Sequence, residues 1–97
     1  MRFEIVLAPE ALEDLRALRA VHRAAVRAAL ETHLRHDPTK TSRSRIKRLR
    51  GMWRPQYRLR VDEIRIFYDV SGRTVEILAI VDKEEAESWL ARFGSPA

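Results

Sequence analysis

Three stretches of strand-forming residues near the end of the chain, joined by very short connections, constrain the fold more than any other feature. They are QYRLRV (56–61), IRIFYDV (64–70) and TVEILAIV (74–81). Only Asp62-Glu63 separates the first two, and Ser71-Gly72, a favoured turn pair, joins the last two. Because connections this short join neighbouring antiparallel strands, the sequence predicts a mostly antiparallel sheet.

The N-terminal part of the chain predicts one further strand and two helices. RFEIVLAP alternates apolar residues at positions 3, 5 and 7 with other side chains, which is the period of a half-buried strand. Pro9 suits the first turn of a helix, and a second helical segment extends from about 21 to 36, where Asp37-Pro38 ends it. The last segment, KEEAESWLARF (83–93), has apolar residues at helical spacing and acids in its first turn, so it also predicts a helix.

The order of elements is therefore β-α-α-β-β-β-α, which predicts an α+β fold in a single domain over residues 1–97. We expect a mostly antiparallel four-stranded sheet with the helical hairpin on one face, and a C-terminal helix. Residues 38 to 52 are polar, basic and without periodicity. They are expected to form a loop, apart from a short turn through residues 45–50.

Composition excludes several classes of function. The chain has no cysteine, and its three histidines lie in one segment without a matching acidic cluster, so we expect no metal site and no cofactor. No run of about 18 apolar residues occurs, and the N-terminus lacks the pattern of an export signal. We therefore expect a cytoplasmic protein with no membrane partner.

Positive charge is concentrated in one part of the chain. Between Pro38 and Val61 there are nine Lys or Arg residues and no Asp or Glu, although the net charge of the whole protein is only +5. A general preference for arginine codons would explain the abundance of arginine but not the absence of neighbouring acids. Localised basicity of this kind is expected of a nucleic-acid binder.

The strand pattern predicts where the arginines of this region point. Side-chain direction alternates along a strand, so Arg58 and Arg60 share one face. If Asp62-Glu63 is the tip of a two-residue loop, Arg60 lies directly across from Arg65, and Arg58 across from Phe67. Opposed like charges destabilise a sheet by a few tenths to about 1 kcal/mol. We therefore expect this arrangement to serve the binding of a phosphodiester, because it does not serve the stability of the fold.

The same arithmetic applied to Ser71-Gly72 places Leu78 across from Arg65 and Glu76 across from Phe67. The arginine-bearing side of the sheet would then be half apolar, through Phe67, Leu78 and Ile80. We expect the C-terminal helix, with Trp89 and Leu90, to cover that half, and the helical hairpin to pack on the other face.

These residues resemble a known family. RLRGM, followed by YRLRVDEIRIFYDV and then VEILAIVDKEEAESWL, resembles the RelE/ParE superfamily of type II toxins over nearly the whole chain. The resemblance implies one of two activities. RelE-like members are ribosome-dependent nucleases that cut mRNA, whereas ParE-like members poison DNA gyrase. We expect first a RelE-type activity, that of a metal-independent endoribonuclease that inhibits translation. The alternative is a ParE-type activity.

The resemblance also implies roles for individual residues. Arg58 and Arg60 match the two basic positions of the RelE strand, one of which is proposed as the base, and Arg65 and Arg50 match arginines that hold the phosphate. The expected catalytic residues are Arg58, Arg60 and Arg65. The expected RNA- or phosphate-binding residues are Lys47, Arg48, Arg50, Trp53 and Lys83. Trp53 would stack on a base, unless it anchors the loop over the edge of the core.

The sequence departs from the RelE pattern in two ways. RelE prefers lysine in the central strand, and arginine is a poor base but a better bidentate phosphate clamp. No tyrosine follows the last strand to act on the leaving group. Tyr57, Tyr68 and Glu84 remain as candidates for the general acid, although both tyrosines fall on the predicted core face.

The resemblance implies partners as well. They are the ribosome with its mRNA, and a cognate acidic antitoxin, either Phd/YefM-like or RelB-like, whose disordered segment would fold onto the arginine-bearing side of the sheet. A third hypothesis is that the domain has lost its toxicity and serves as the partner of the antitoxin in operator binding.

Overall fold

The computed structural model describes all residues, 1–97, and its main feature is a five-stranded sheet in the order β1-β6-β5-β4-β2. β1 is parallel to β6 and the other neighbours are antiparallel. The expected α+β class with a mostly antiparallel sheet is confirmed, but the sheet has five strands and not four, because a short strand from the basic segment adds to its edge. The elements are β1 (Glu4–Leu7), α1 (Pro9–Ala17), α2 (Ala20–Ala29), η1 (Leu30–Leu34), β2 (Ile46–Arg48), β3 (Met52–Arg54), β4 (Tyr57–Val61), β5 (Ile64–Ser71), β6 (Thr74–Asp82), η2 (Lys83–Glu85), α3 (Ala86–Phe93) and β7 (Ser95–Pro96).

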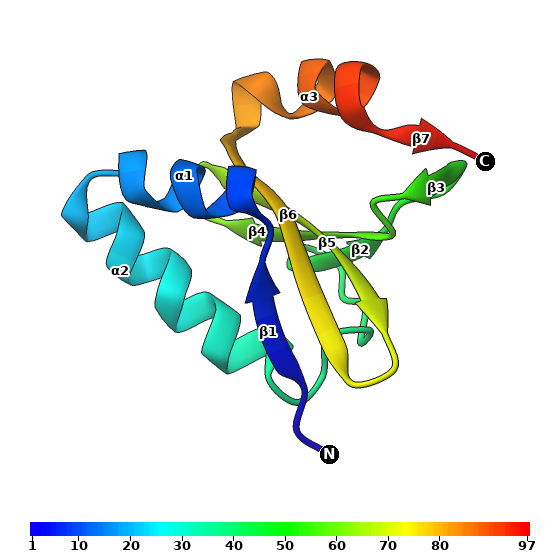
Figure 1. Cartoon of the computed structure of the whole chain (residues 1–97), viewed down its shortest axis with the longest axis horizontal. Coiled ribbons are helices and arrows are strands. Elements are labelled where there is room, and N and C mark those ends of the chain that lie inside the picture. Colours follow the sequence, from blue (N-terminus) through cyan, green and yellow to red (C-terminus); the bar gives the residue numbers. More distant parts are fainter.

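The helices α1 and α2 pack together on one face of the sheet, as expected (Figure 1). α1 begins at Pro9, whose missing N–H costs nothing in a first turn. The chain of α2 continues into η1, a π-helical turn, before it leaves the sheet. The core formed between these helices and the sheet contains Ala11, Leu15, Val26, Ala29, Leu30, Leu34, Ile46, Leu59, Val61, Ile64, Ile66, Tyr68, Val75, Ile77 and Ile80.

The hairpin between β4 and β5 has the predicted register. Arg58 pairs with Phe67 and Arg60 with Arg65, through the two-residue loop Asp62-Glu63. Asp62 adopts a left-handed backbone conformation, with φ at 52°, which aspartate tolerates better than most residues. The local pattern was therefore sufficient to place these arginines opposite one another.

The predicted register of the next hairpin is wrong. Ser71 pairs with Thr74, so the loop is Gly72-Arg73, and Gly72 supplies the positive φ (58°) that the first loop position of a tight turn requires. A register shift between Phe67 and Tyr68 then inserts an extra residue in β6.

As a result of the shift, the partner of Arg65 is Val81 and the partner of Phe67 is Ala79, in place of Leu78 and Glu76. Ile80 also moves to the helical face, where it joins the core.

The segment expected to be a loop contains two short strands. β2 pairs with β4 as the edge of the main sheet, because Ile46 is buried in the core among basic neighbours. The Ser42 hydroxyl accepts hydrogen bonds from the N–H groups of Arg45 and Ile46, and so fixes the start of this strand. β3 pairs with β7 at the C-terminus.

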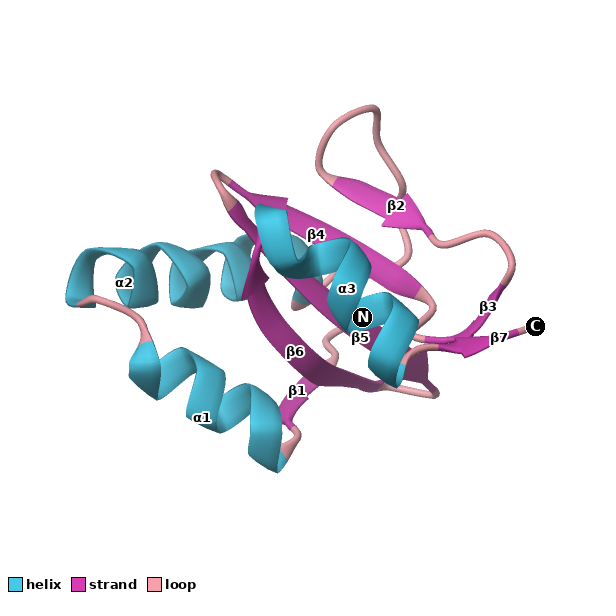
Figure 2. Ribbon diagram, turned by 90° about the horizontal axis from the view of Figure 1, so that it is seen from above, coloured by secondary structure: helices cyan, strands magenta, loops and turns pink.

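The last helix lies on the other side of the sheet from α1 and α2 (Figure 2). No residue of α3 is fully buried. Trp89 holds it by stacking on Phe67, with the ring centroids 5.0 Å apart and the planes 9° apart. Trp89 therefore covers Phe67 as predicted. At the end of α3, Gly94 has no room for a side chain, because a Cβ would lie 2.6 Å from the Leu90 carbonyl oxygen.

No helix of the structure is long and apolar enough to span a lipid bilayer.

Candidate phosphate-binding site

Four basic residues come to one side of the sheet, and we call this surface the arginine face. The register aligns Lys47 of β2 with Arg58 of β4 and Phe67 of β5, and aligns Arg60 with Arg65 in the next row. Residues directly paired across antiparallel strands point to the same side. The arginine face thus consists of Lys47, Arg58, Arg60 and Arg65.

None of these four side chains is neutralised by the protein itself. No carboxylate forms an ion pair with any of them within 4.0 Å. Burial lowers the pKa of the Arg58 guanidinium from its usual value, and the positive charges of Arg65 and Arg60 lower it further. The Nε atom of Arg58 is buried and has no hydrogen-bond partner. A guanidinium with an unused N–H, crowded by like charges, is arranged to bind an anion.

Arg65 is held in place by the hairpin tip. Its Nη1 atom donates to the carbonyl oxygens of Asp62, at 2.8 Å, and Ile64, at 3.1 Å. These bonds use part of its donor capacity and leave the charge uncompensated. Arg65 is therefore a positioned source of positive charge beside Arg58 and Arg60.

Lys83 lies at the margin of this surface but is not free. Its Nζ forms an ion pair with Glu63 at 2.9 Å. The hydrogen bond and charge of Lys83 lower the pKa of Glu63, with smaller effects from Arg65 and Arg60. An RNA phosphate would have to compete with this carboxylate for Lys83.

The remaining predicted RNA contacts are not gathered on the arginine face. Arg48 lies on the opposite face, with its Nη1 bonded to the Gln56 carbonyl at 2.8 Å and its guanidinium over the Tyr57 ring. Arg50 is exposed in the turn between β2 and β3. Trp53 is 75% exposed, so it does not anchor the loop to the core.

The tyrosines do not reach the arginine face. Tyr57 and Tyr68 stack on each other at 5.4 Å on the helical face, as their predicted core position implied. The Tyr68 hydroxyl donates to the Pro38 carbonyl at 2.6 Å, and burial raises the pKa of this group. Neither tyrosine can protonate a leaving group on the other side of the sheet.

One basic residue of the central stretch has a structural role that the sequence did not reveal. Arg54 forms ion pairs with Asp69 at 3.3 Å and with Glu76 at 3.1 Å. Both carboxylates come from strands distant in the sequence, so only the paired strands show that this charge is compensated. No group of three or more His, Cys, Asp or Glu side chains is placed to bind a metal ion.

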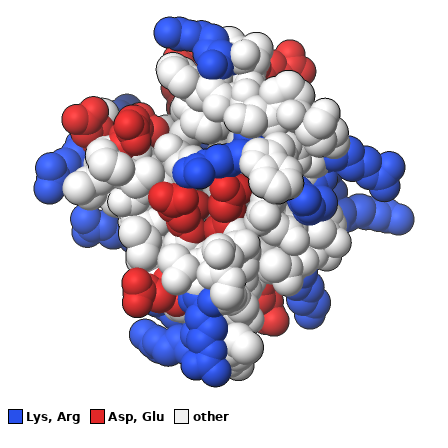
Figure 3. Space-filling model, turned by 45° about the vertical axis from the view of Figure 1, so that its right-hand side comes forward, with Lys and Arg blue, Asp and Glu red and all other residues white.

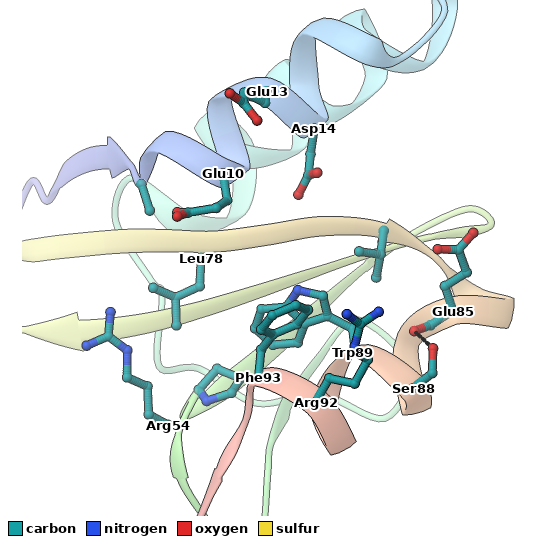
Figure 4. Close-up of a pocket in the computed structure, with 13 residues that line it drawn as sticks. Glu10, Glu13, Asp14, Arg54, Leu78, Glu85, Ser88, Trp89, Arg92 and Phe93 are labelled. Atoms are coloured by element: carbon teal, nitrogen blue, oxygen red, sulfur yellow. Dashed lines mark hydrogen bonds between the residues drawn. The ribbon is translucent and has the colours of Figure 1, made fainter.

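A groove of about 570 Å³ lies between α1 and α3, beside the covered part of the sheet (Figure 4). Acidic residues Glu10, Glu13 and Asp14 of α1 line one wall. Trp89 and Phe93 of α3 line the other. The Oδ2 atom of Asp14 accepts a hydrogen bond from the Ile80 N–H at 3.0 Å, so this carboxylate also ties α1 to the bulged part of β6.

The carboxyl group of Asp14 gives a prediction for pH dependence. Its pKa is raised from 3.8, mainly by burial and in smaller part by the charges of Glu13 and Glu10. A carboxyl group whose pKa is higher in the folded state loses its contribution to stability as the pH rises through that pKa. Asp14→Asn, which can still accept the Ile80 N–H, should therefore be more stable than the wild type at pH 7.

The stabilising effect of Asp14→Asn should shrink as the pH falls through the raised pKa of the wild-type carboxyl, and it should be gone below about 4, the pKa of an unperturbed aspartate. Urea unfolding of both proteins from pH 3 to pH 8 checks this. An equal difference in the free energy of unfolding at all pH values would contradict the assignment.

The fold is that of known toxins. The RelE–RelB complex from Pyrococcus horikoshii OT3 matches with a TM-score of 0.70 and 19% identity over 86% of this chain and 97% of the other. The RelBE2 toxin–antitoxin complex from Mycobacterium tuberculosis matches with a TM-score of 0.69 and 23% identity over 84% and 92%. The RelB–RelE complex from Methanococcus jannaschii matches with a TM-score of 0.65 and 19% identity over 87% and 96%. Comparison with curated protein sequences found no match.

The fold and the family match together define the class of protein, a type II toxin of the RelE/ParE superfamily. Within it, the chain belongs to the family described as ParE toxin of type II toxin-antitoxin system, parDE, whose model matches residues 5–87.

Proposed function

We propose that this toxin is a RelE-type mRNA interferase that binds the scissile phosphate of ribosome-bound mRNA on its arginine face. The observation that carries the proposal is the Arg58 guanidinium, half-buried, without an acidic partner and next to Arg60 and Arg65. Uncompensated buried charge costs stability, so it indicates a surface selected for a ligand. Action on translating ribosomes would place the protein in the cytoplasm.

The chemistry of this face favours electrostatic catalysis. Cleavage of RNA by its own 2′-hydroxyl builds negative charge on the phosphate, which preorganised guanidinium groups stabilise. Arg58 and Arg60 would clamp the phosphate oxygens, and Arg65 would add charge from its fixed position. Arginine remains protonated at neutral pH, so these side chains supply charge and orientation more readily than proton transfer.

The second candidate is a ParE-type inhibitor of DNA gyrase, which needs no hydrolytic chemistry. Two observations favour it. The matching family model is that of ParE toxins. Tyr57 and Tyr68 lie on the other face of the sheet, so neither can supply the acid that RNA cleavage requires.

Primer extension on cellular mRNA after induced expression distinguishes the two activities. Under the first proposal we expect cuts in translated mRNA, phased with the codons, within minutes of induction. An inhibitor of translation initiation that removes ribosomes from the message should abolish the cuts. Intact mRNA together with accumulating DNA breaks would contradict the nuclease proposal and support the ParE-type activity.

The proposed partner is an antitoxin that neutralises the arginine face. The three similar structures reported above are complexes of a toxin with its antitoxin. A segment that covers Lys47, Arg58 and Arg60 should be acidic, and its binding should weaken with added salt. It would belong to a Phd/YefM-like or a RelB-like protein. If toxicity has been lost, this complex would be the functional form in operator binding.

A further inference from the structure

The groove between α1 and α3 has two walls of different chemistry. Glu10, Glu13 and Asp14 stand along α1, and Trp89 and Phe93 stand along α3 (Figure 4). Leu78 and Val81 of β6 form part of the floor, and Glu85 closes one end. Phe93 remains 59% exposed in this position. A ligand that fits would be apolar on one side and positively charged on the other.

The acids of this groove form no ion pair with the basic residues of the protein. None of the four carboxylates takes part in an ion pair within 4.0 Å, in a molecule whose net charge is +5. Two basic residues also line the groove. Arg92 places its guanidinium over the Phe93 ring, and Arg54 is held by Asp69 and Glu76. Figure 3 shows acidic side chains gathered at the centre of one face of the molecule, with a basic side chain directly beside them.

Helix dipoles do not account for this arrangement. Glu10 lies in the first turn of α1, where a negative charge is favourable. Glu13 and Asp14 lie beyond that turn, and Glu85 comes from a different element. Burial is the main cause that raises the pKa of Asp14, and repulsion from Glu13 and Glu10 raises it further. A cation in the groove would relieve that repulsion.

The groove runs along β6 between α1, on one side of the sheet, and α3, on the other; its floor residue Val81 pairs with Arg65 and so lies on the side of the arginine face. The strand order places β6, which lines the groove, next to β5, and β5 next to β4. Trp89 stacks on Phe67 of β5, and Phe67 pairs with Arg58 of β4. A single partner chain running from the groove to the arginine face would meet an acidic surface and then a basic one.

We propose that the groove is a second antitoxin-binding surface, which receives a cationic side chain flanked by apolar ones. The antitoxin would carry two segments of opposite charge, an acidic one for the arginine face and a cationic, apolar one for the groove. The acids of α1 complement a cationic side chain, and the aromatic side chains of α3 complement the apolar ones beside it. The proposal rests on the antitoxin partnership proposed above, but not on nuclease activity.

Binding to the groove can be measured through Trp89. Replacing Trp53 by phenylalanine leaves Trp89 as the only tryptophan, so its fluorescence reports on the groove. The probes are two 12-residue peptides, one of alternating Arg and Leu pairs and one with Glu in place of every Arg. We expect only the Arg peptide to change the Trp89 emission, although the net charge of the protein opposes its approach.

Paired variants test which acids are responsible. Glu10→Gln combined with Glu13→Gln should weaken binding of the Arg peptide about tenfold. Glu84→Gln combined with Glu87→Gln is the matched control, because these acids also stand near the start of a helix but do not line the groove. The control should bind as the unmodified protein does. Equal affinity for both peptides, or equal effects of the two variant pairs, would overturn the proposal.

The complex with the antitoxin provides the second readout. In it, Trp89 should be protected from acrylamide quenching at least threefold relative to the free toxin, and the Glu10→Gln/Glu13→Gln pair should reduce this protection. Equal quenching in the free and bound toxin would overturn the assignment to the antitoxin. Sedimentation of the free toxin tests whether a second copy of this chain occupies the groove. Self-association that is lost in the Glu10→Gln/Glu13→Gln pair would assign the groove to that second copy. Intact mRNA in the primer extension experiment would contradict the nuclease and leave these measurements valid.

Discussion

Arg58→Met is expected to abolish growth inhibition and to weaken binding of a short RNA oligonucleotide by about 10- to 100-fold. A hydrogen bond to a charged group contributes about 1.5–3 kcal/mol, and this residue has an unused N–H for it. Methionine keeps most of the apolar contact area of the side chain. Growth curves after induction and fluorescence anisotropy with labelled RNA measure the two effects.

The same substitution should not destabilise the protein. It removes a partly buried charge whose ionisation is opposed by burial and by Arg65 and Arg60. The relief of opposed like charges is of the order of a few tenths to 1 kcal/mol, so the melting temperature should stay equal or rise. Loss of activity would then reflect loss of ligand binding.

Arg27→Met is the matched control, because Arg27 is exposed on α2, a helix of the other face. It changes the net charge by the same amount and should leave toxicity intact. Full toxicity of Arg58→Met would remove the arginine face from the mechanism. Loss of toxicity in both variants would show that net charge alone is decisive.

Phe67→Ala is expected to lower the free energy of unfolding by about 3–5 kcal/mol, the usual range for a buried phenylalanine. Phe67 is 1% exposed and is the stacking partner through which α3 is attached to the sheet. Since small domains have about 5–15 kcal/mol in total, the variant should be close to its limit of stability. Urea denaturation measures the loss, and hydrogen exchange should show the amides of α3 becoming less protected.

A double-mutant cycle tests whether the contact between Phe67 and Trp89 attaches α3 to the sheet. Trp89→Ala should cost less than Phe67→Ala, because Trp89 is only partly buried, and the two losses should not add, with a coupling of about 0.5–1.5 kcal/mol. Phe93→Ala removes an exposed aromatic residue from the same helix and should change stability by less than about 0.5 kcal/mol. If Phe67→Ala cost no more than Phe93→Ala, α3 would not lie over Phe67 in solution.

The arginine face was largely predictable because its geometry is local. Arg58, Arg60 and Arg65 lie within eight residues of one another, on two strands joined by a two-residue loop, so alternation and loop length determine their pairing. The position of Lys47 was harder to predict from the sequence. It depends on β2, three residues long, whose only sequence signal is Ile46 among basic neighbours.

The second hairpin shows where local rules fail. The choice between Ser71-Gly72 and Gly72-Arg73 as the loop depends on which position takes a positive φ. The register shift opposite Phe67 and Tyr68 places an extra residue in β6, and the Asp14 carboxylate of α1, far away in the sequence, accepts the Ile80 N–H on the same strand. Each of these shifts the pairing without changing the pattern of apolar residues.

The sequence alone determined the order of the elements, the antiparallel hairpins and the side of the sheet on which three arginines meet, because each follows from backbone periodicity over a few residues. Only the tertiary structure decided which charges remain uncompensated. Arg54 and Lys83 find carboxylates on neighbouring strands, Arg58 finds none, and the acids of α1 face α3 from the opposite end of the chain. Charge compensation acts through space between distant segments, and local pattern carries no information about it.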